Sequence, residues 1–257
     1  MKRFLVSLVC IALASNAGAF AQKTTPKKKG KTKAAKIVPT DTSKMTAADR
    51  QEAMRTPDPE MAVLDSLQKS DKRYESIEEA LKEPEAVRFL DLHEKNLTTL
   101  PSEIGKLVNL HTLSLYGNQL TTIPAEFGNL KNLKSVDFGK NQLTEVPASV
   151  LKLKNLKVLY LTSNQITKFP KELCTAFPKL NVLDVGGNQI ASLPADISKM
   201  QEVRIMNFRF NRLETLPESM AKLKKLEMIQ LNNNPISEKE LRKIDKMLKS
   251  VDIRFTY

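Results

Sequence analysis

The sequence predicts an α/β solenoid, with a curved parallel sheet on the concave side, short helical or irregular segments on the convex side, and a cap at each end. Three observations support this prediction. One apolar pattern starts at residues 87, 110, 133, 156, 180, 203 and 226, so seven copies follow one another in steps of 23 residues, with one step of 24. The middle of each copy alternates with the period of a strand. An asparagine and a proline then recur at fixed places, and a fixed period of this length indicates stacked units.

Residues 1–21 have the pattern of a secretory signal peptide. Lys2 and Arg3 precede an apolar run that ends near residue 14, and a cleavage site follows at 19–21, with 17–19 as the alternative. The run is shorter than the roughly 20 residues of a membrane-spanning helix. Lipidation of Cys10 is disfavoured because the bulky Val9 precedes it. We therefore expect an exported protein, secreted, periplasmic or associated with the cell surface, with no transmembrane segment in the mature chain.

Residues 22–44 form a tail rich in Lys, Thr, Pro and Ala, which buries too little apolar surface to order itself. Much of the formal net charge of +12 lies here. Two interpretations stay open: a solvated linker, or a tether to an acidic envelope polymer or an anionic surface. The residues of the tether would be Lys27, Lys28, Lys29, Lys31 and Lys33. Specific nucleic-acid binding is disfavoured, because no aromatic side chain lies among these lysines to stack on a base.

Residues 45–86 are predicted to form a helical N-terminal cap. Apolar residues recur at helical spacing between 61 and 67, and a second stretch from Tyr74 to Lys82 places Ile77 and Leu81 on one face. Ser76, with a glutamate three residues later, matches a capping box. The proline at 84 should end this helix.

The seven repeats span residues 87–236, and each contains a short strand. In the second repeat, Leu113 and Leu115 should point inward, while Thr112, Ser114 and Tyr116 point outward. Stacked once per repeat, these strands form a parallel sheet along the inner side of an arc. Prolines then begin the convex half, where the missing N–H costs no hydrogen bond.

The asparagine that follows each strand is predicted to form a structural ladder. Its amide can donate and accept hydrogen bonds where the chain turns away from the sheet. The first repeat has Lys95 at this place, as suits an end repeat. The ladder residues are Asn118, Asn141, Asn164, Asn188, Asn211 and Asn234.

Residues 237–257 are predicted to form a C-terminal cap of one helix and one strand. Ser237 and Glu240 match a second capping box, and the helix that they open should bury Leu241, Ile244 and Leu248. The segment from 251 to 257 is rich in β-branched and aromatic residues, which favour a last strand.

The repeat pattern resembles the leucine-rich-repeat family, in its 23-residue form with Leu-Pro closing each half-repeat. The second copy shows it over Leu110 to Leu120, closed by Ile123-Pro124. The segment from Tyr74 to Leu92 is also similar to the start of bacterial secreted proteins of this family. The resemblance implies a solenoid that acts as a binding module.

The outward strand positions are free of core demands, so a binding site is expected there. Four apolar residues on consecutive strands should form an exposed stripe, and exposed contiguous apolar surface marks contact sites, although β-branched residues also simply favour strands. We expect a protein or peptide partner on the concave face, with Tyr160, Arg209 and Phe210 as anchors. The whole predicted site is Tyr116, Val158, Tyr160, Val182, Asp184, Ile205, Arg209, Phe210 and Met228.

Charged side chains offer two further interpretations. The aspartates at 91, 137 and 184 share one outward position, where they would orient a basic group of the partner or merely solubilise a wet face. The position before the strand is basic in five repeats, which supports the competing hypothesis of an acidic polymer as partner. These residues are Arg88, His111, Lys134, Lys157 and Arg204.

The sequence argues against an enzyme and predicts no catalytic residues, no metal and no cofactor. His93 and His111 lie one repeat apart in different columns, with no cysteine or recurrent carboxylate at ligand spacing. No phosphate-binding loop or nucleophile motif is present. Cys174, the one cysteine left after signal removal, is expected to be a small buried apolar residue.

Overall fold

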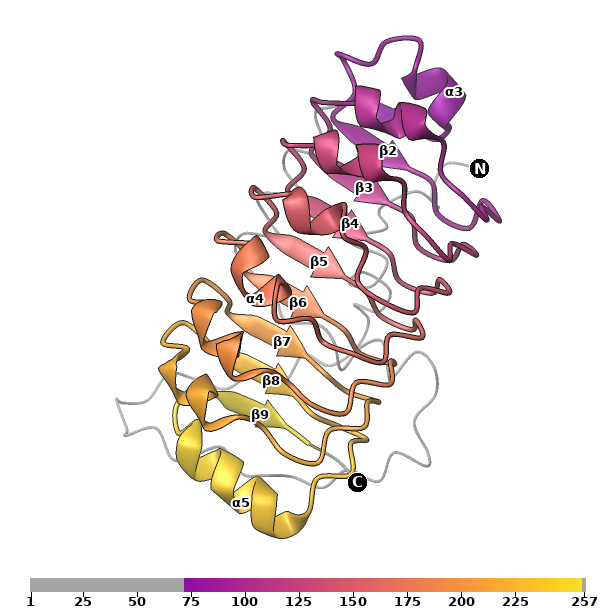
Figure 1. The fold of residues 1–257 in the computed structure, drawn as a ribbon. Coiled ribbons are helices and arrows are strands. Elements are labelled where there is room, and N and C mark those ends of the chain that lie inside the picture. Colours follow the sequence, from indigo (N-terminus) through magenta and orange to yellow (C-terminus); the bar gives the residue numbers. More distant parts are fainter. Residues whose placement is uncertain (1–71, 256–257) are drawn as a thin grey trace, which may run out of the picture.

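The computed structural model describes residues 72–255, which form one sheet of nine parallel strands in chain order. The predicted signal peptide, the Lys-rich tail and the first part of the predicted cap, up to residue 71, lie outside the described residues. Figure 1 shows the strands stacked side by side, with the short helices on the opposite side of each turn. The strands are β1 Arg73–Tyr74, β2 Phe89–Asp91, β3 Thr112–Ser114, β4 Ser135–Asp137, β5 Val158–Tyr160, β6 Val182–Asp184, β7 Ile205–Asn207, β8 Met228–Gln230 and β9 Asp252–Arg254.

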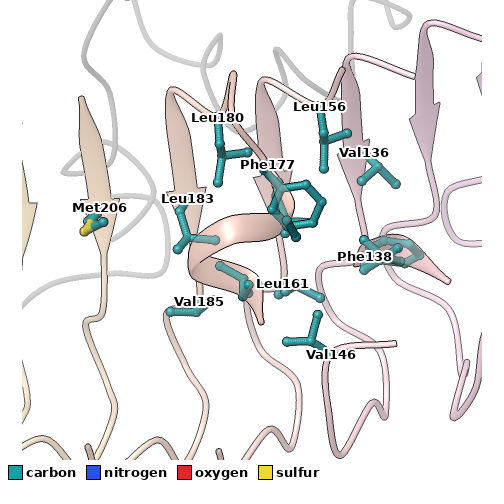
Figure 2. Packing of buried hydrophobic residues seen from close by; sticks show 14 of the residues in the cluster. Val136, Phe138, Val146, Leu156, Leu161, Phe177, Leu180, Leu183, Val185 and Met206 are labelled. Atoms are coloured by element: carbon teal, nitrogen blue, oxygen red, sulfur yellow. The ribbon is translucent and has the colours of Figure 1, made fainter. Parts of the chain in front are cut away.

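Equivalent positions of the repeats pair with one another. Leu90 aligns with Leu113, and Leu159 with Leu183, so the inward side chains stack into a continuous core. The middle residue of each strand from β2 to β8 is fully buried. Figure 2 shows Leu183 reaching inward from its strand toward Phe177 on the convex side. Equivalent inward residues of successive repeats therefore stack on one another, and each inward position of the strand gives one apolar column.

The convex side consists mainly of short 3₁₀ helices over Ser102–Lys106, Ala125–Asn129, Val150–Lys152, Ala195–Lys199 and Glu218–Lys222. Four of them begin directly after a proline, as at Pro101, whose φ is −69°. Proline presets this angle and has no N–H to leave unpaired. The repeat that is 24 residues long instead contains α4, Leu173–Ala176, followed by the buried Phe177.

The asparagines after the strands lie buried and connect neighbouring repeats. The Asn141 side-chain oxygen accepts from the Leu120 N–H at 2.9 Å, and its nitrogen donates to the carbonyl oxygens of Leu115 at 2.9 Å and Phe138 at 3.0 Å. The other five make the equivalent bonds. Each asparagine thereby pairs buried backbone groups that would cost about 1–3 kcal/mol if left unsatisfied.

The N-terminal cap differs from the prediction in one respect. Tyr74 belongs to β1 and pairs with Leu90, rather than opening a helix. The helix α3 is only Ile77–Ala80; Ser76 caps it by accepting from the Glu79 N–H at 3.0 Å, and the partly buried Leu81 lies just beyond its end. The physical reason is the open edge of the first repeat, whose strand gains hydrogen bonds when residues 73–74 extend the sheet.

The C-terminal cap follows the prediction. The helix α5, Glu238–Met247, begins at Ser237, whose hydroxyl accepts from the Glu240 N–H at 3.3 Å. Leu241, Ile244 and Leu248 are buried. The strand β9 pairs in parallel with β8 and ends the sheet.

Candidate functional site

The four predicted apolar residues form a contiguous row on the concave face. Val158 pairs with Val182, Val182 with Ile205, and Ile205 with Met228. Val158 and Val182 make a small apolar cluster apart from the core, with Tyr160 and Ile205 packed against it. We call these four residues, Val158, Val182, Ile205 and Met228, the apolar stripe.

The exposure predicted for the apolar stripe is wrong. Val158 is 3% exposed, Val182 7% and Met228 6%, and only Ile205 is half-buried. Side chains at equivalent positions of adjacent strands lie about 4.8 Å apart and cover one another, and Tyr160 adds to this cover. The stripe is therefore contiguous but tightly packed.

Phe210 is the exposed aromatic residue of the predicted site, at 39%. It lies just beyond the end of β7, and the Arg209 guanidinium lies 5.8 Å from its ring centre. Its φ is +52°, a left-handed angle that is strained for a bulky residue. The same position is left-handed in every repeat, and the other residues there are Glu94, Gly117, Lys140, Ser163, Gly187 and Asn233.

The aspartates of the concave face are buried rather than solvated, so their predicted alternative role as solubilising residues is wrong. The Asp137 carboxylate accepts from the Gly139 N–H at 2.7 Å, and Asp184 accepts from the Gly186 N–H at 2.9 Å. Asp184 also accepts from the Asn207 side chain at 2.9 Å. Their carboxylates therefore hold the backbone where the strand ends, a local bond typical of Asp and Asn.

Burial shifts the ionisation of both carboxyls. It raises the pKa of Asp137 to about 7; the Gly139 N–H opposes this shift and Asp184 adds repulsion. Burial also raises the pKa of Asp184, against the hydrogen bond from Gly186 and the nearby charge of Arg209. The two carboxyls flank Tyr160, because Asp137, Tyr160 and Asp184 are aligned on β4, β5 and β6.

The structure brings together most, but not all, of the predicted site. Tyr160, Asp184 and the apolar stripe are neighbours on β5 to β8, and Arg209 and Phe210 follow β7. Tyr116 follows β3 instead, where Lys140 lies 5.2 Å from its ring centre. Tyr116 therefore belongs to the N-terminal half of the concave face.

Comparison with models of known protein families identifies the repeats. The chain matches a family model described as a leucine-rich repeat region over residues 60–174, one described as leucine rich repeat over 178–236, and one described as two copies of leucine rich repeats over 154–199. This chain is a leucine-rich-repeat protein. No curated protein matches it.

Two solved structures are similar to this leucine-rich-repeat protein, and the first of them shares its fold. An internalin (inlF) from Listeria monocytogenes matches with a TM-score of 0.57 and 19% identity, over 71% of this chain and 53% of that one. This chain thus spans about half the length of the internalin structure. The ectodomain of the plant receptor kinase GASSHO1/SCHENGEN3 from Arabidopsis thaliana, in complex with CASPARIAN STRIP INTEGRITY FACTOR 2, matches with a TM-score of 0.48 and 33% identity, over 56% and 17%.

Two features of the leucine-rich-repeat protein were not predicted from its sequence. A second row of asparagines precedes the strands: Asn109, Asn132 and Asn155 each donate to a backbone carbonyl 24 residues earlier. The sequence signal of this row is the Asn-Leu pair that recurs every 23 residues at 109, 132 and 155.

The second feature lies at the N-terminal end of the sheet. There, Asp91 lies between Arg73 and His93, and its carboxylate is 2.8 Å from the His93 ring nitrogen. Arg73 comes from β1, which the sequence did not predict.

Between residues 72 and 255, no group of three or more His, Cys, Asp or Glu residues is arranged to hold a metal ion. No helix of this described range has the length and apolar character needed to cross a membrane. The Cys174 side chain is buried, and burial raises the pKa of its thiol to about 12. A thiol with so high a pKa is a poor nucleophile.

Proposed function

We propose that this leucine-rich-repeat protein is a secreted, non-enzymatic binding protein that recognises a protein or peptide on the C-terminal half of its concave face. The observation that supports this most is the apolar stripe, a contiguous row of closely packed apolar side chains on the concave face, in which Val158 and Val182 form a cluster apart from the core and Ile205 is half-buried. The fold is typically a binding scaffold, and its concave surface is extended.

The residues around the apolar stripe fit this role. Tyr160 is half-buried at one end, and Arg209 and Phe210 lie beside β7. Aromatic and arginine side chains dominate the binding energy of protein interfaces. Phe210 supplies exposed aromatic area at a turn position whose left-handed angle is shared by every repeat. Asp184 is buried and bonded to Gly186 and Asn207, so it supports the ends of β6 and β7 beneath this surface.

Export is part of the proposal, and its support is the pattern of residues 1–21. The acidic-polymer tether through Lys27, Lys28, Lys29, Lys31 and Lys33 has no support among the comparisons, and these lysines lie outside the described residues. We therefore place the main function on the sheet. Removal of residues 1–21 during secretion, read by N-terminal sequencing, tests the export.

The partner is sought by crosslinking and then tested with the purified proteins. A photocrosslinking amino acid at position 160 should capture a discrete partner, and the same group at the exposed Val108, away from the sheet, should not. Calorimetry then compares the unchanged chain with Val182→Glu/Ile205→Glu, which should lose binding at least tenfold. The matched control, Val108→Glu/Ala221→Glu, adds the same two charges at exposed positions outside the stripe.

Phe210→Gly separates a contact role from a structural one. Glycine accepts the left-handed angle without strain, so the thermal midpoint should hold or rise, while affinity for the partner falls roughly tenfold, as expected for an interface anchor. Ser163→Gly makes the same change at the equivalent position and should leave affinity unchanged. Unchanged affinity of both the Phe210 variant and the stripe variant would refute the proposed site.

A further inference from the structure

The turn after β2 contains a three-residue pattern that occurs once in the whole sequence. Asn96, Leu97 and Thr98 match Asn-x-Ser/Thr, the pattern at which an oligosaccharide is attached to asparagine in exported proteins. In every later repeat another residue replaces this asparagine, so the pattern is lost. These residues are Gln119, Gln142, Gln165, Gln189, Arg212 and Pro235.

The backbone of this turn presents Asn96 to solvent. The Asn118 side-chain oxygen accepts from the Lys95 N–H at 3.1 Å and from the Leu97 N–H at 2.9 Å, which holds the chain on both sides of Asn96. The φ of Asn96 is +57°, an angle that asparagine adopts more readily than most residues. Its side chain is exposed, and no hydrogen bond joins its amide to another residue of the range 72–255. The amide is therefore open to an enzyme.

The residues two positions away on each side of Asn96 are also accessible. Thr98, whose hydroxyl belongs to the pattern, is exposed, and so is Glu94. The Glu94 side chain lies along Gly117, where a Cβ would come within 2.7 Å of the Glu94 Cγ. None of the residues equivalent to Glu94 in the later repeats is acidic: they are Gly117, Lys140, Ser163, Gly187, Phe210 and Asn233. The first repeat alone thus combines the asparagine, the threonine and a carboxylate with which a basic group of an enzyme can pair.

We propose that Asn96 carries an N-linked oligosaccharide, and that the transferase recognises Thr98 and Glu94 beside it. The enzyme is an oligosaccharyltransferase, and its donor is an oligosaccharide attached to a polyisoprenyl pyrophosphate. The amide nitrogen of Asn96 forms a bond to the anomeric carbon of the first sugar and loses one proton to a base of the enzyme. The bond from that carbon to the pyrophosphate oxygen breaks, and the lipid pyrophosphate leaves with the electron pair. No oxidant or reductant is consumed.

An oligosaccharide on Asn96 lies away from the site proposed for a protein partner. Asn96 follows β2, whereas the apolar stripe begins on β5, three strand spacings or about 14 Å further along the sheet. The modification rests on the proposed export, because the donor and the transferase act on exported chains. It does not rest on the apolar stripe, so the two sites can fail independently.

Two versions of the chain test the site in a bacterial host that carries an oligosaccharyltransferase and its lipid-linked donor. One is the full chain, and in the other a leader peptide of the host replaces residues 1–21. Mass spectrometry of the exported chain and of its peptides should find one oligosaccharide, on the peptide with Asn96, in both versions. Addition in the second version alone would support the site and contradict the proposed export. An exported second version with unmodified Asn96 would overturn the site.

Substitutions in the turn test recognition. Asn96→Asp keeps the size of the side chain and tolerates the left-handed angle, so it should abolish the added mass without changing the thermal midpoint. Thr98→Ala should also abolish the addition, whereas Thr99→Ala, which removes the neighbouring exposed hydroxyl, should not. Equal modification of the two threonine variants would overturn the assignment.

Transfer of the pattern to another repeat tests the role of Glu94. Lys140→Glu/Gln142→Asn gives the turn after β4 the same three residues, because Thr144 is already present there. All three positions are exposed, so this variant should gain a second oligosaccharide. Gln142→Asn alone leaves a lysine in place of the acid and should be modified in a smaller fraction of chains. Equal modification of these two variants would overturn the role of Glu94.

Discussion

At the scale of single residues, Asp137 makes a hydrogen bond to the backbone in a place where burial disfavours its charged form. Its carboxylate accepts the Gly139 N–H at 2.7 Å, yet burial raises its pKa to about 7. The protonated carboxyl is therefore favoured in the folded chain. The related Asn207 accepts the Arg209 N–H at 3.0 Å and carries no charge, so the backbone bond alone does not require an acid.

Asp137→Asn should make stability less dependent on pH. The folded pKa lies above the ordinary value of 3.8, so the stabilisation from Asp137 is complete below that value and is lost as the pH rises through about 7. The variant should match the unchanged chain near pH 4 and exceed its free energy of unfolding at pH 8 by up to about 4 kcal/mol. Urea unfolding across this range measures the difference. A variant that is less stable at pH 8 would show that the charged carboxylate stabilises the fold.

At the scale of elements, the two rows of asparagines differ in burial and so in energetic weight. Asn164 accepts from the Leu143 N–H at 3.0 Å and donates to the Phe138 carbonyl oxygen at 2.9 Å, both in the buried ladder. Asn155, which directly precedes this repeat, donates to the Lys131 carbonyl oxygen at a more exposed place. Asn164→Ala should therefore cost about 2–4 kcal/mol of unfolding free energy, and Asn155→Ala about 1 kcal/mol or less.

Denaturant unfolding of both variants measures this contrast. Equal costs at the two positions would contradict a ladder that acts by pairing buried backbone groups. The pair is well matched, because both changes remove an asparagine side chain and the two positions lie on either side of β5.

The elements that the sequence predicted are those set by periodicity. The leucines at 113 and 115 predict an inward-facing strand, and Asn118 predicts the turn that follows it, because these properties repeat with the chain. The strand at Arg73–Tyr74 was not predicted, since it forms only in response to the open edge of β2. The burial of Val158 was also missed, because it depends on the side chains of adjacent strands rather than on its own repeat.

At the scale of the whole molecule, each repeat contacts its neighbours in the sheet and little else. Deleting residues 237–257 removes α5 and β9 and leaves β8 as an open edge. We expect hydrogen-exchange protection to fall mainly in β7 and β8, while β3 to β5 keep theirs, because a solenoid couples nearest neighbours. Ser237→Ala, which removes only the helix cap, should change protection only slightly. Uniform loss of protection along the chain would indicate one cooperative unit instead.

The one-to-one pairing of strands also bears on how such a chain can change in length. Phe89 pairs with Thr112 and Thr112 with Ser135, always at the same step. Excision of residues 110–132 would place Lys134 directly after Arg88 in the ladder and Ser135 beside Phe89, with every leucine still facing inward. Loss or gain of a whole repeat therefore keeps the pairing of all the other strands. Loss of a single residue, by contrast, shifts one repeat out of register with the repeats on either side of it. The arc and its concave face can lengthen or shorten during evolution without any redesign of the interior.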